Sequence, residues 1–233
     1  MTTNWSGEDV VCEHREVKAT AAAIDSSGRF LLLSGRLATS IIDLQNPQVV
    51  LKRISRKSRW EVGVAAWNYH YDYKHLIAVG SNQRVDILNF EYVTSDLVDN
   101  GHSIKGLTRT ILDLDWNNSD PGLIVTCSVD NYVNIWDYKD LRKPVASLPS
   151  VCGASQAKWS KTGKNFLATA HEADCKIWDF RKASTPVEYI SAHSSKVNGI
   201  DWNPNNANQL VTCAQDHYVK VLLSLRTHKK IIT

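Results

Sequence analysis

Short apolar runs alternate with polar turns along the chain, and a tryptophan closes one of these runs at nearly regular intervals. Four tryptophans follow one another at steps of 49, 43 and 43 positions: Trp67, Trp116, Trp159 and Trp202. An apolar residue stands two positions before each of the last three, which is the alternation of a β-strand. No segment carries a sustained helical period. The pattern predicts a repeat of about 43 residues built from short strands.

A second set of anchors supports the repeat. Residues 135–138 read Ile-Trp-Asp-Tyr, and residues 177–180 read Ile-Trp-Asp-Phe. Residues 125–135 match residues 211–221 at six of eleven positions, at an offset of 86. Several strands in a repeat of this length are typical of a β-propeller blade, a small sheet that buries its faces by stacking against neighbouring blades. We expect an all-β propeller.

Composition narrows the class of protein. The 233 residues are 43% hydrophobic and 22% charged, with a net charge of +3, which is ordinary for a globular chain and too weakly basic to indicate nucleic acid. No apolar run approaches the length of a membrane span, and the N-terminus is polar. The five cysteines are odd in number and lack Cys-x-x-Cys spacing, so they indicate neither disulfides nor a zinc site. We expect a cytoplasmic protein.

The third repeat carries the fullest motif. It reads Gly101-His102, then Trp116 at the end of a strand, Ser128 and Asp130 before a turn, and Trp136-Asp137. These residues resemble the WD-repeat family of β-propellers. The resemblance implies a hydrogen-bonded structural tetrad inside the blade, formed by His102, Ser128, Asp130 and Trp136. It also implies that these residues hold the fold and are not catalytic.

The resemblance covers residues 9–225 and implies five blades, so that the chain looks like an incomplete seven-bladed ring, a truncated or splice-altered product. We place the blades at residues 18–55, 60–98, 102–148, 150–190 and 193–225. Residues 1–8 are expected to be flexible, and residues 226–233 form a divergent tail. We expect the open ends of such a ring to expose two apolar rows: Ile24, Leu31 and Leu33, and Ile200, Trp202 and Val211.

Candidate chemistry is sparse. Asp113 and Asp115 share one strand face, away from Leu114 and Trp116, and we interpret them as a solvated face and not as a catalytic pair. The histidines lack the spacing of zinc ligands. Cys127 and Cys213 stand at equivalent positions and are expected to be small core residues. We expect no enzyme activity, cofactor or metal.

Two features suggest partner contacts. A basic run, which would lie near one ring face, fits an acidic protein surface, a phosphate or an anionic lipid; it comprises Lys52, Arg53, Arg56, Lys57 and Arg59. Residues 178–181 read Trp-Asp-Phe-Arg, which resembles the motif by which some WD-repeat proteins dock on the adaptor of cullin-four ubiquitin ligases through an arginine, here Arg181.

Two functions follow from these resemblances. The favoured one is a non-enzymatic scaffold, because the chain resembles a propeller subunit of a GATOR-type complex. That resemblance implies propeller-containing subunits as partners, a role in promoting TOR complex one signalling in response to amino acids, and association with the lysosomal surface through the complex. The alternative is a substrate-receptor module of a ubiquitin ligase.

Overall fold

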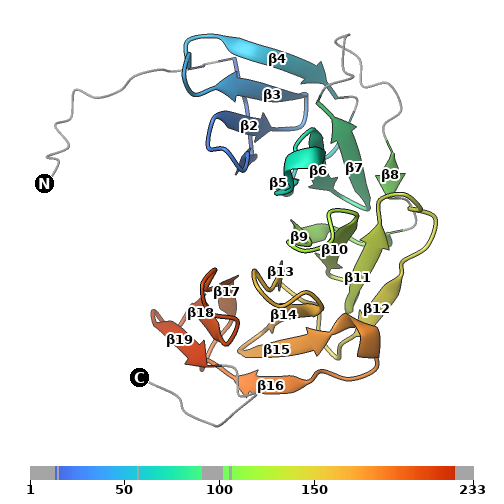
Figure 1. The fold of residues 1–233 in the computed structure, drawn as a ribbon, viewed down its shortest axis with the longest axis vertical. Helices are drawn as coiled ribbons and strands as arrows, with labels where there is room; N and C mark the ends of the chain where they lie inside the picture. The colour runs from blue at the N-terminus through green and yellow to red at the C-terminus, as the bar shows by residue number, and fades with distance from the viewer. Residues whose placement is uncertain (1–13, 15, 57, 91–101, 105–106, 224–233) are drawn as a thin grey trace, which may run out of the picture.

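The described part of the chain is a row of small antiparallel sheets. The computed structural model describes residues 14, 16–56, 58–90, 102–104 and 107–223. Its 19 strands form five sheets, four with four strands and the last with three. In Figure 1 the sheets stand side by side as the blades of an open arc, with the first and fifth at its two ends. The expected all-β propeller with five blades and an incomplete ring is confirmed.

Strands follow one another outward in each blade, from the inside of the arc to its rim (Figure 1). The first blade comprises β1 (Ala21–Ile24), β2 (Phe30–Ser34), β3 (Ala38–Asp43) and β4 (Val50–Ser55). The second comprises β5 (Val64–Trp67), β6 (Leu76–Ser81), β7 (Arg84–Asn89) and β8 (Ser103–Ile104). The third comprises β9 (Ile111–Trp116), β10 (Leu123–Ser128), β11 (Tyr132–Asp137) and β12 (Ala146–Pro149).

The last two blades repeat this order. The fourth comprises β13 (Gln156–Trp159), β14 (Phe166–His171), β15 (Asp174–Asp179) and β16 (Glu188–Ser191). The fifth comprises β17 (Val197–Trp202), β18 (Gln209–Ala214) and β19 (Val219–Leu223). Two short 3₁₀ turns, Tyr71–Tyr73 and Phe180–Lys182, complete the described elements, and none of the described helices is long and apolar enough to cross a bilayer.

In four blades the turn between the second and third strands contains a residue in the left-handed region of the backbone map. In each case one residue of the turn adopts a positive φ, between 45° and 67°: Gln83, Asn131, Glu172 and His217. Such left-handed residues let a short turn follow the twist of its two strands. Polar turns predicted from the sequence thus connect these strand pairs, with one left-handed residue in each of the four.

Apolar cores lie between neighbouring blades. The inner strands of the second to fifth blades each send a tryptophan toward the preceding blade: Trp116 packs with Val85 and Ile87 of the second blade. Its indole nitrogen also donates to the carbonyl of Ala66, at 3.3 Å. Because side chains alternate along a strand, the residues one and three positions before the tryptophan face the following blade.

The structure corrects two expectations. Ile200 and Trp202 were expected on an exposed end face, but both are buried against the fourth blade, because the tryptophan of each inner strand faces backward along the arc. The third blade does not begin at residue 102, because β8 pairs with β7 and belongs to the second blade. Residues 1–8 and 226–233, predicted as a flexible terminus and a divergent tail, lie outside the described residues.

Candidate interaction surfaces

Polar side chains join the inner strands of the third and fourth blades. Asp113 and Asp115 lie on β9, are buried, and face β13. Asp113 Oδ2 accepts the backbone N–H of Ala157 at 3.2 Å, and Asp115 Oδ2 accepts that of Trp159 at 2.9 Å. The interpretation of these carboxylates as a solvated face is wrong, because this face of an inner strand is covered by the next blade.

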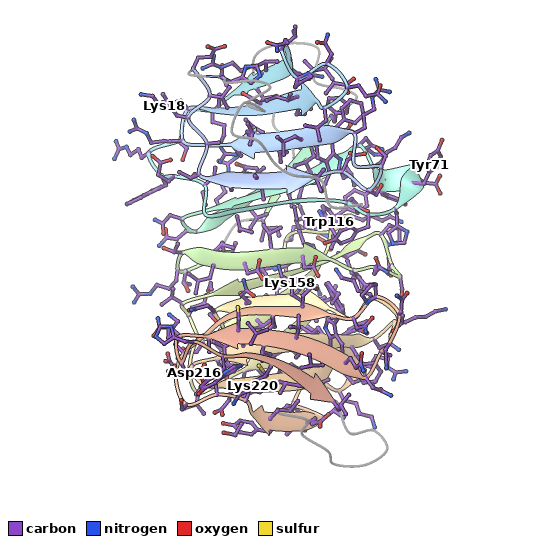
Figure 2. All side chains as sticks on the ribbon, turned by 90° about the vertical axis from the view of Figure 1, so that its left-hand side faces the viewer. Lys18, Tyr71, Trp116, Lys158, Asp216 and Lys220 are labelled. Atoms are coloured by element: carbon purple, nitrogen blue, oxygen red, sulfur yellow. The ribbon has the colours of Figure 1, made fainter. Side chains whose placement is uncertain are left out.

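Lys158 balances part of this buried negative charge. Its Nζ lies 2.8 Å from Asp113 Oδ2, and the Tyr69 hydroxyl donates to Asp115 Oδ1 at 2.8 Å. Burial raises the pKa of Asp113, against the opposing charge of Lys158. Burial by itself lowers the pKa of Lys158, but the charges of Asp113 and Asp115 outweigh it and the pKa is raised. The network ties neighbouring blades together, and Figure 2 shows Lys158 in the view through the open side of the arc.

The next interface repeats the arrangement with an amide. Gln156 stands where Asp113 stands in the third blade, and its Oε1 accepts the backbone N–H of Ile200 at 2.7 Å. In the fifth blade, Gly199 stands at the position of Asp113, and Asp201 stands at the position of Asp115. Asp201 is exposed, and its Oδ1 accepts the N–H of Trp202 in its own strand, at 2.8 Å.

A pocket of about 600 Å³ opens beside this last inner strand. It is lined by polar side chains of the inner strands and of the loops that follow them, and by the outward face of the fifth blade: Tyr69, Lys158, Lys161, Asp201, Val211 and Cys213. The Lys161 ammonium lies 4.8 Å from the centre of the Tyr69 ring. The pocket therefore lies where the described blades end.

The predicted tetrad does not form from the four residues named for it. Trp136 Nε1 donates to Thr126 Oγ1 at 2.9 Å, and Ser128 Oγ instead accepts the backbone N–H of Asp130. His102 is exposed and precedes β8 of the second blade. The hydroxyl partner of the indole is thus Thr126, two residues earlier in β10 than the predicted Ser128.

The distance in sequence from the tryptophan of the inner strand explains why His102 was wrongly predicted as the tetrad histidine. In the fifth blade the histidine lies nine positions before the tryptophan of the inner strand, as His193 does before Trp202. Nine positions before Trp116 stands Leu107, whereas His102 lies fourteen positions before it. Leu107 is buried in the core between the second and third blades. Measuring from the tryptophan would have identified the replacement from the sequence.

The fifth blade holds a histidine network of the predicted kind. His193 Nδ1 lies 2.9 Å from the Asp216 carboxylate, and its Nε2 lies 2.8 Å from Thr212 Oγ1. Thr212 is the equivalent of Thr126 in the third blade. The position of the tryptophan is taken by Leu222, which is buried.

The fourth blade has a similar network, in which the histidine lies on the same strand, β14, as the threonine. Trp178 Nε1 donates to Thr169 Oγ1 at 2.8 Å, and His171 Nε2 lies 2.7 Å from the same hydroxyl. Burial, with the nearby Lys176 ammonium, lowers the pKa of His171 to about 4. The neutral imidazole is therefore part of the blade at physiological pH.

The predicted basic run divides between two faces. Lys52 Nζ donates to the carbonyl of Phe90 at 2.9 Å, and burial lowers the pKa of its ammonium. The Arg56 guanidinium, almost fully buried, lies 3.4 Å from Asp86. Both cations therefore pack against the second blade and are not available to a partner.

Arg53 and Arg59 make up the accessible part of the run. Arg53 lies on β4, the outermost strand of the first blade as expected, and Arg59 lies on the loop that leads to the second blade. Both are exposed, as is the neighbouring Trp60. Lys57 lies outside the described residues.

Arg181 is exposed but already paired. Its Nε and one terminal nitrogen donate to the two carboxylate oxygens of Asp179, at 2.9 and 2.6 Å. Arg142 forms the same two-pronged pair with Asp140 in the third blade. Asp179 thus neutralises part of the charge of Arg181, and this pairing lends no support to docking on a ligase adaptor.

The cysteines and possible metal ligands of the described residues form no reactive-thiol or metal site. Cys127 and Cys175 are buried, and burial raises the pKa of both thiols, that of Cys175 to about 12. Cys213 is exposed, so the prediction of a core residue is confirmed for Cys127 and is wrong for Cys213. Within the described ranges, no group of three or more His, Cys, Asp or Glu side chains could hold a metal ion.

Comparison with known families agrees with this architecture. The family described as WD domain, G-beta repeat matches residues 97–137 and 184–221. The chain carries WD40 repeats. The first matched segment includes most of the third blade, and the second includes the fifth, the two WD40 repeats in which the internal sequence match is strongest.

Individual relatives extend the similarity to most of the chain. The chain is 46% identical over 217 residues to the human GATOR2 complex protein WDR59, which is 93% of this chain and 22% of that protein. It is 39% identical to the Drosophila melanogaster GATOR2 complex protein Wdr59, over 95% of this chain. It is 34% identical to maintenance of telomere capping protein 5 of Saccharomyces cerevisiae, over 86% of this chain. The chain spans 22%, 23% and 17% of the lengths of these relatives.

Proposed function

We propose that the chain is a non-enzymatic protein-interaction module of a GATOR-type complex. The single observation that carries this proposal is the 46% identity to the human GATOR2 complex protein WDR59 over 93% of the chain. The proposal includes a role in promoting TOR complex one signalling in response to amino acids. It also includes a cytoplasmic location, with association with the lysosomal surface through the other subunits.

Other propeller-containing subunits are the proposed partners, and exposed arginines are the proposed contacts. Arg53 and Arg59 project from the outer strand and the following loop of the first blade. Exposed cations attract an acidic protein surface and fix its orientation more than they add to affinity. Arg181 is a third exposed cation, on the fourth blade, although Asp179 neutralises part of its charge.

Affinity purification of the tagged chain from cells, followed by mass spectrometry, tests the proposal. We expect recovery of propeller-containing subunits of a GATOR-type complex. The double variant Arg53→Glu, Arg59→Glu should reduce that recovery severalfold, whereas Arg142→Glu, at another exposed cation, on the third blade, should not. Recovery of the cullin-four adaptor in place of these subunits would contradict the proposal, and equal loss with both variants would contradict the assigned surface.

A further inference from the structure

Exposed side chains gather where the first and second blades meet, at the end of the sheets where β4 leads into β5. The turn between β2 and β3 and the loop from β4 to β5 lie together there. The backbone N–H of Arg56, at the start of the loop, donates to the carbonyl of Leu37 in the turn at 2.7 Å. Leu37 and Trp60, one from each segment, are 58% and 56% exposed. The turn and the loop therefore form one surface, with a large apolar side chain from each.

Arginines flank both apolar side chains. Arg36 precedes Leu37 in the turn, and its Nε lies 3.8 Å from Oε1 of Glu61, the residue after Trp60. The Arg36 and Glu61 side chains are 52% and 60% exposed, so both stay accessible to a partner. Arg59 precedes Trp60 and is exposed as well. Positive charge thus accompanies the apolar side chain of each segment.

The second blade adds a further arginine. Asp86 on β7 lies 3.4 Å from the Arg56 guanidinium and also pairs with Arg84, the first residue of the same strand. The Arg56 and Asp86 side chains are largely buried, whereas that of Arg84 is 56% exposed. The buried carboxylate therefore holds Arg84 beside the loop that begins at Arg56. We call the exposed set the junction patch: Arg36, Leu37, Arg59, Trp60 and Arg84.

The exposure of the junction patch does not come from the ends of the arc. The first and second blades, which form the junction, are both in place. In the third blade, which has a blade on each side, the corresponding turn leaves Val129 54% exposed, and the loop that follows the blade leaves Val151 96% exposed. Turns and loops at this end of the sheets therefore stay open to solvent between neighbouring blades.

The groups in the patch specify the chemistry of a partner. Tryptophan and arginine are the side chains that most often anchor protein–protein interfaces. The arginine fork binds a carboxylate through two parallel hydrogen bonds. A uniformly anionic bilayer would also face Glu61 and be repelled by it, whereas a polypeptide can place its carboxylates opposite the arginines alone. The patch therefore fits a protein segment with both acidic and apolar side chains.

We propose that the junction patch docks an acidic segment of a partner protein. An apolar side chain of that segment packs on Leu37 and Trp60, and its carboxylates pair with the three arginines, which outnumber the exposed carboxylate of Glu61. The inference rests on the proposed function, because it expects this partner among the propeller-containing subunits. It deepens that function by adding Trp60 and Arg84 to the contacts and by specifying the charge of the partner segment.

Site-specific photo-crosslinking in cells tests the inference on the tagged 233-residue chain. A benzoylphenylalanine at position 37 captures whatever lies against the patch, and tandem mass spectrometry sequences the attached peptide. We expect one attached segment in which Asp and Glu outnumber Lys and Arg. Trp60→Ala and Arg84→Glu should each lower the yield of this adduct about tenfold, because each removes an anchor of the interface.

Arg142→Glu is the matched charge control, because Arg142 is exposed on the third blade and lies outside the patch. The adduct should persist in this variant. Circular dichroism checks folding, and Arg59→Glu replaces either patch variant if that variant unfolds.

Four results would overturn the inference even when propeller-containing subunits co-purify with the chain. They are no adduct, an attached lipid, an attached segment without an excess of acidic residues, and a yield that Trp60→Ala and Arg84→Glu leave unchanged. An acidic segment that depends on both residues but comes from a protein outside a GATOR-type complex would support the patch and contradict the proposed function.

Discussion

Asp115 of the third blade accepts the backbone N–H of Trp159 in the fourth blade at 2.9 Å. A side chain of one sheet thereby satisfies a main-chain donor of its neighbour. An unpaired buried N–H costs free energy comparable to a lost hydrogen bond, so this contact favours the observed spacing of the blades. The buried carboxylates of β9 are therefore structural groups of the blade interface.

We expect Asp113→Ala to lower the free energy of unfolding by about 3–5 kcal/mol, because it leaves the largely buried Lys158 ammonium without its partner. Asp113→Asn should cost less, since the amide oxygen still accepts the N–H of Ala157. Urea unfolding measures both values. As a control, Asp140→Ala, which breaks an exposed pair with Arg142, should leave the urea midpoint unchanged. Equal effects of the two alanine variants would contradict the assigned role of the buried pair.

Thr169→Val should destabilise the chain more than Thr126→Val. Thr126 Oγ1 bonds one buried indole, whereas Thr169 Oγ1 bonds the indole of Trp178 and the imidazole of His171. Each buried polar group left without a partner costs about 1–3 kcal/mol. Thermal unfolding compares the two variants with Thr108→Val, which alters an exposed hydroxyl and should change little. The reverse order for Thr169 and Thr126 would show that the hydrogen bonds of His171 carry no stability.

Acid should weaken the fourth blade through His171. Its pKa is about 4 in the folded chain against 6.5 without burial, so only the unfolded chain takes up a proton between these values. This contribution to stability is full above pH 6.5 and is lost as the pH falls to about 4, by up to about 3 kcal/mol. Urea unfolding at pH 7 and pH 4.5 should show a smaller loss for His171→Gln than for the unaltered chain. The same pH dependence in both would contradict the prediction.

The fold could be predicted because the tryptophan ladder is itself a consequence of packing. Trp116, Trp159 and Trp202 recur every 43 residues because each must fill the same space against the preceding blade. The alternation before each tryptophan shows which residues share a strand face. The sequence pattern does not show what covers that face, so Asp113 and Asp115 were expected in solvent.

The candidate site was harder to predict, because its parts come from positions that a local motif does not connect. The dipeptide Gly101-His102 matches the Gly-His of the WD-repeat motif, but it lies five residues too early relative to Trp116. The basic run is continuous in sequence, yet alternation along β4 sends Lys52 to one face and Arg53 to the other. Only the pairing of β3 with β4 and the position of the second blade decide which cations remain exposed.

Thiol labelling of Cys127 and Cys213 tests the central claim most directly, that equivalent faces are covered inside the arc and bare at its end. The two cysteines occupy the same position of the repeat, 86 residues apart. Cys213 should be modified at least about 100-fold faster than Cys127, because opening a core thiol to solvent costs several kcal/mol. Peptide mass spectrometry assigns each site. Equal protection of the two thiols would contradict the account.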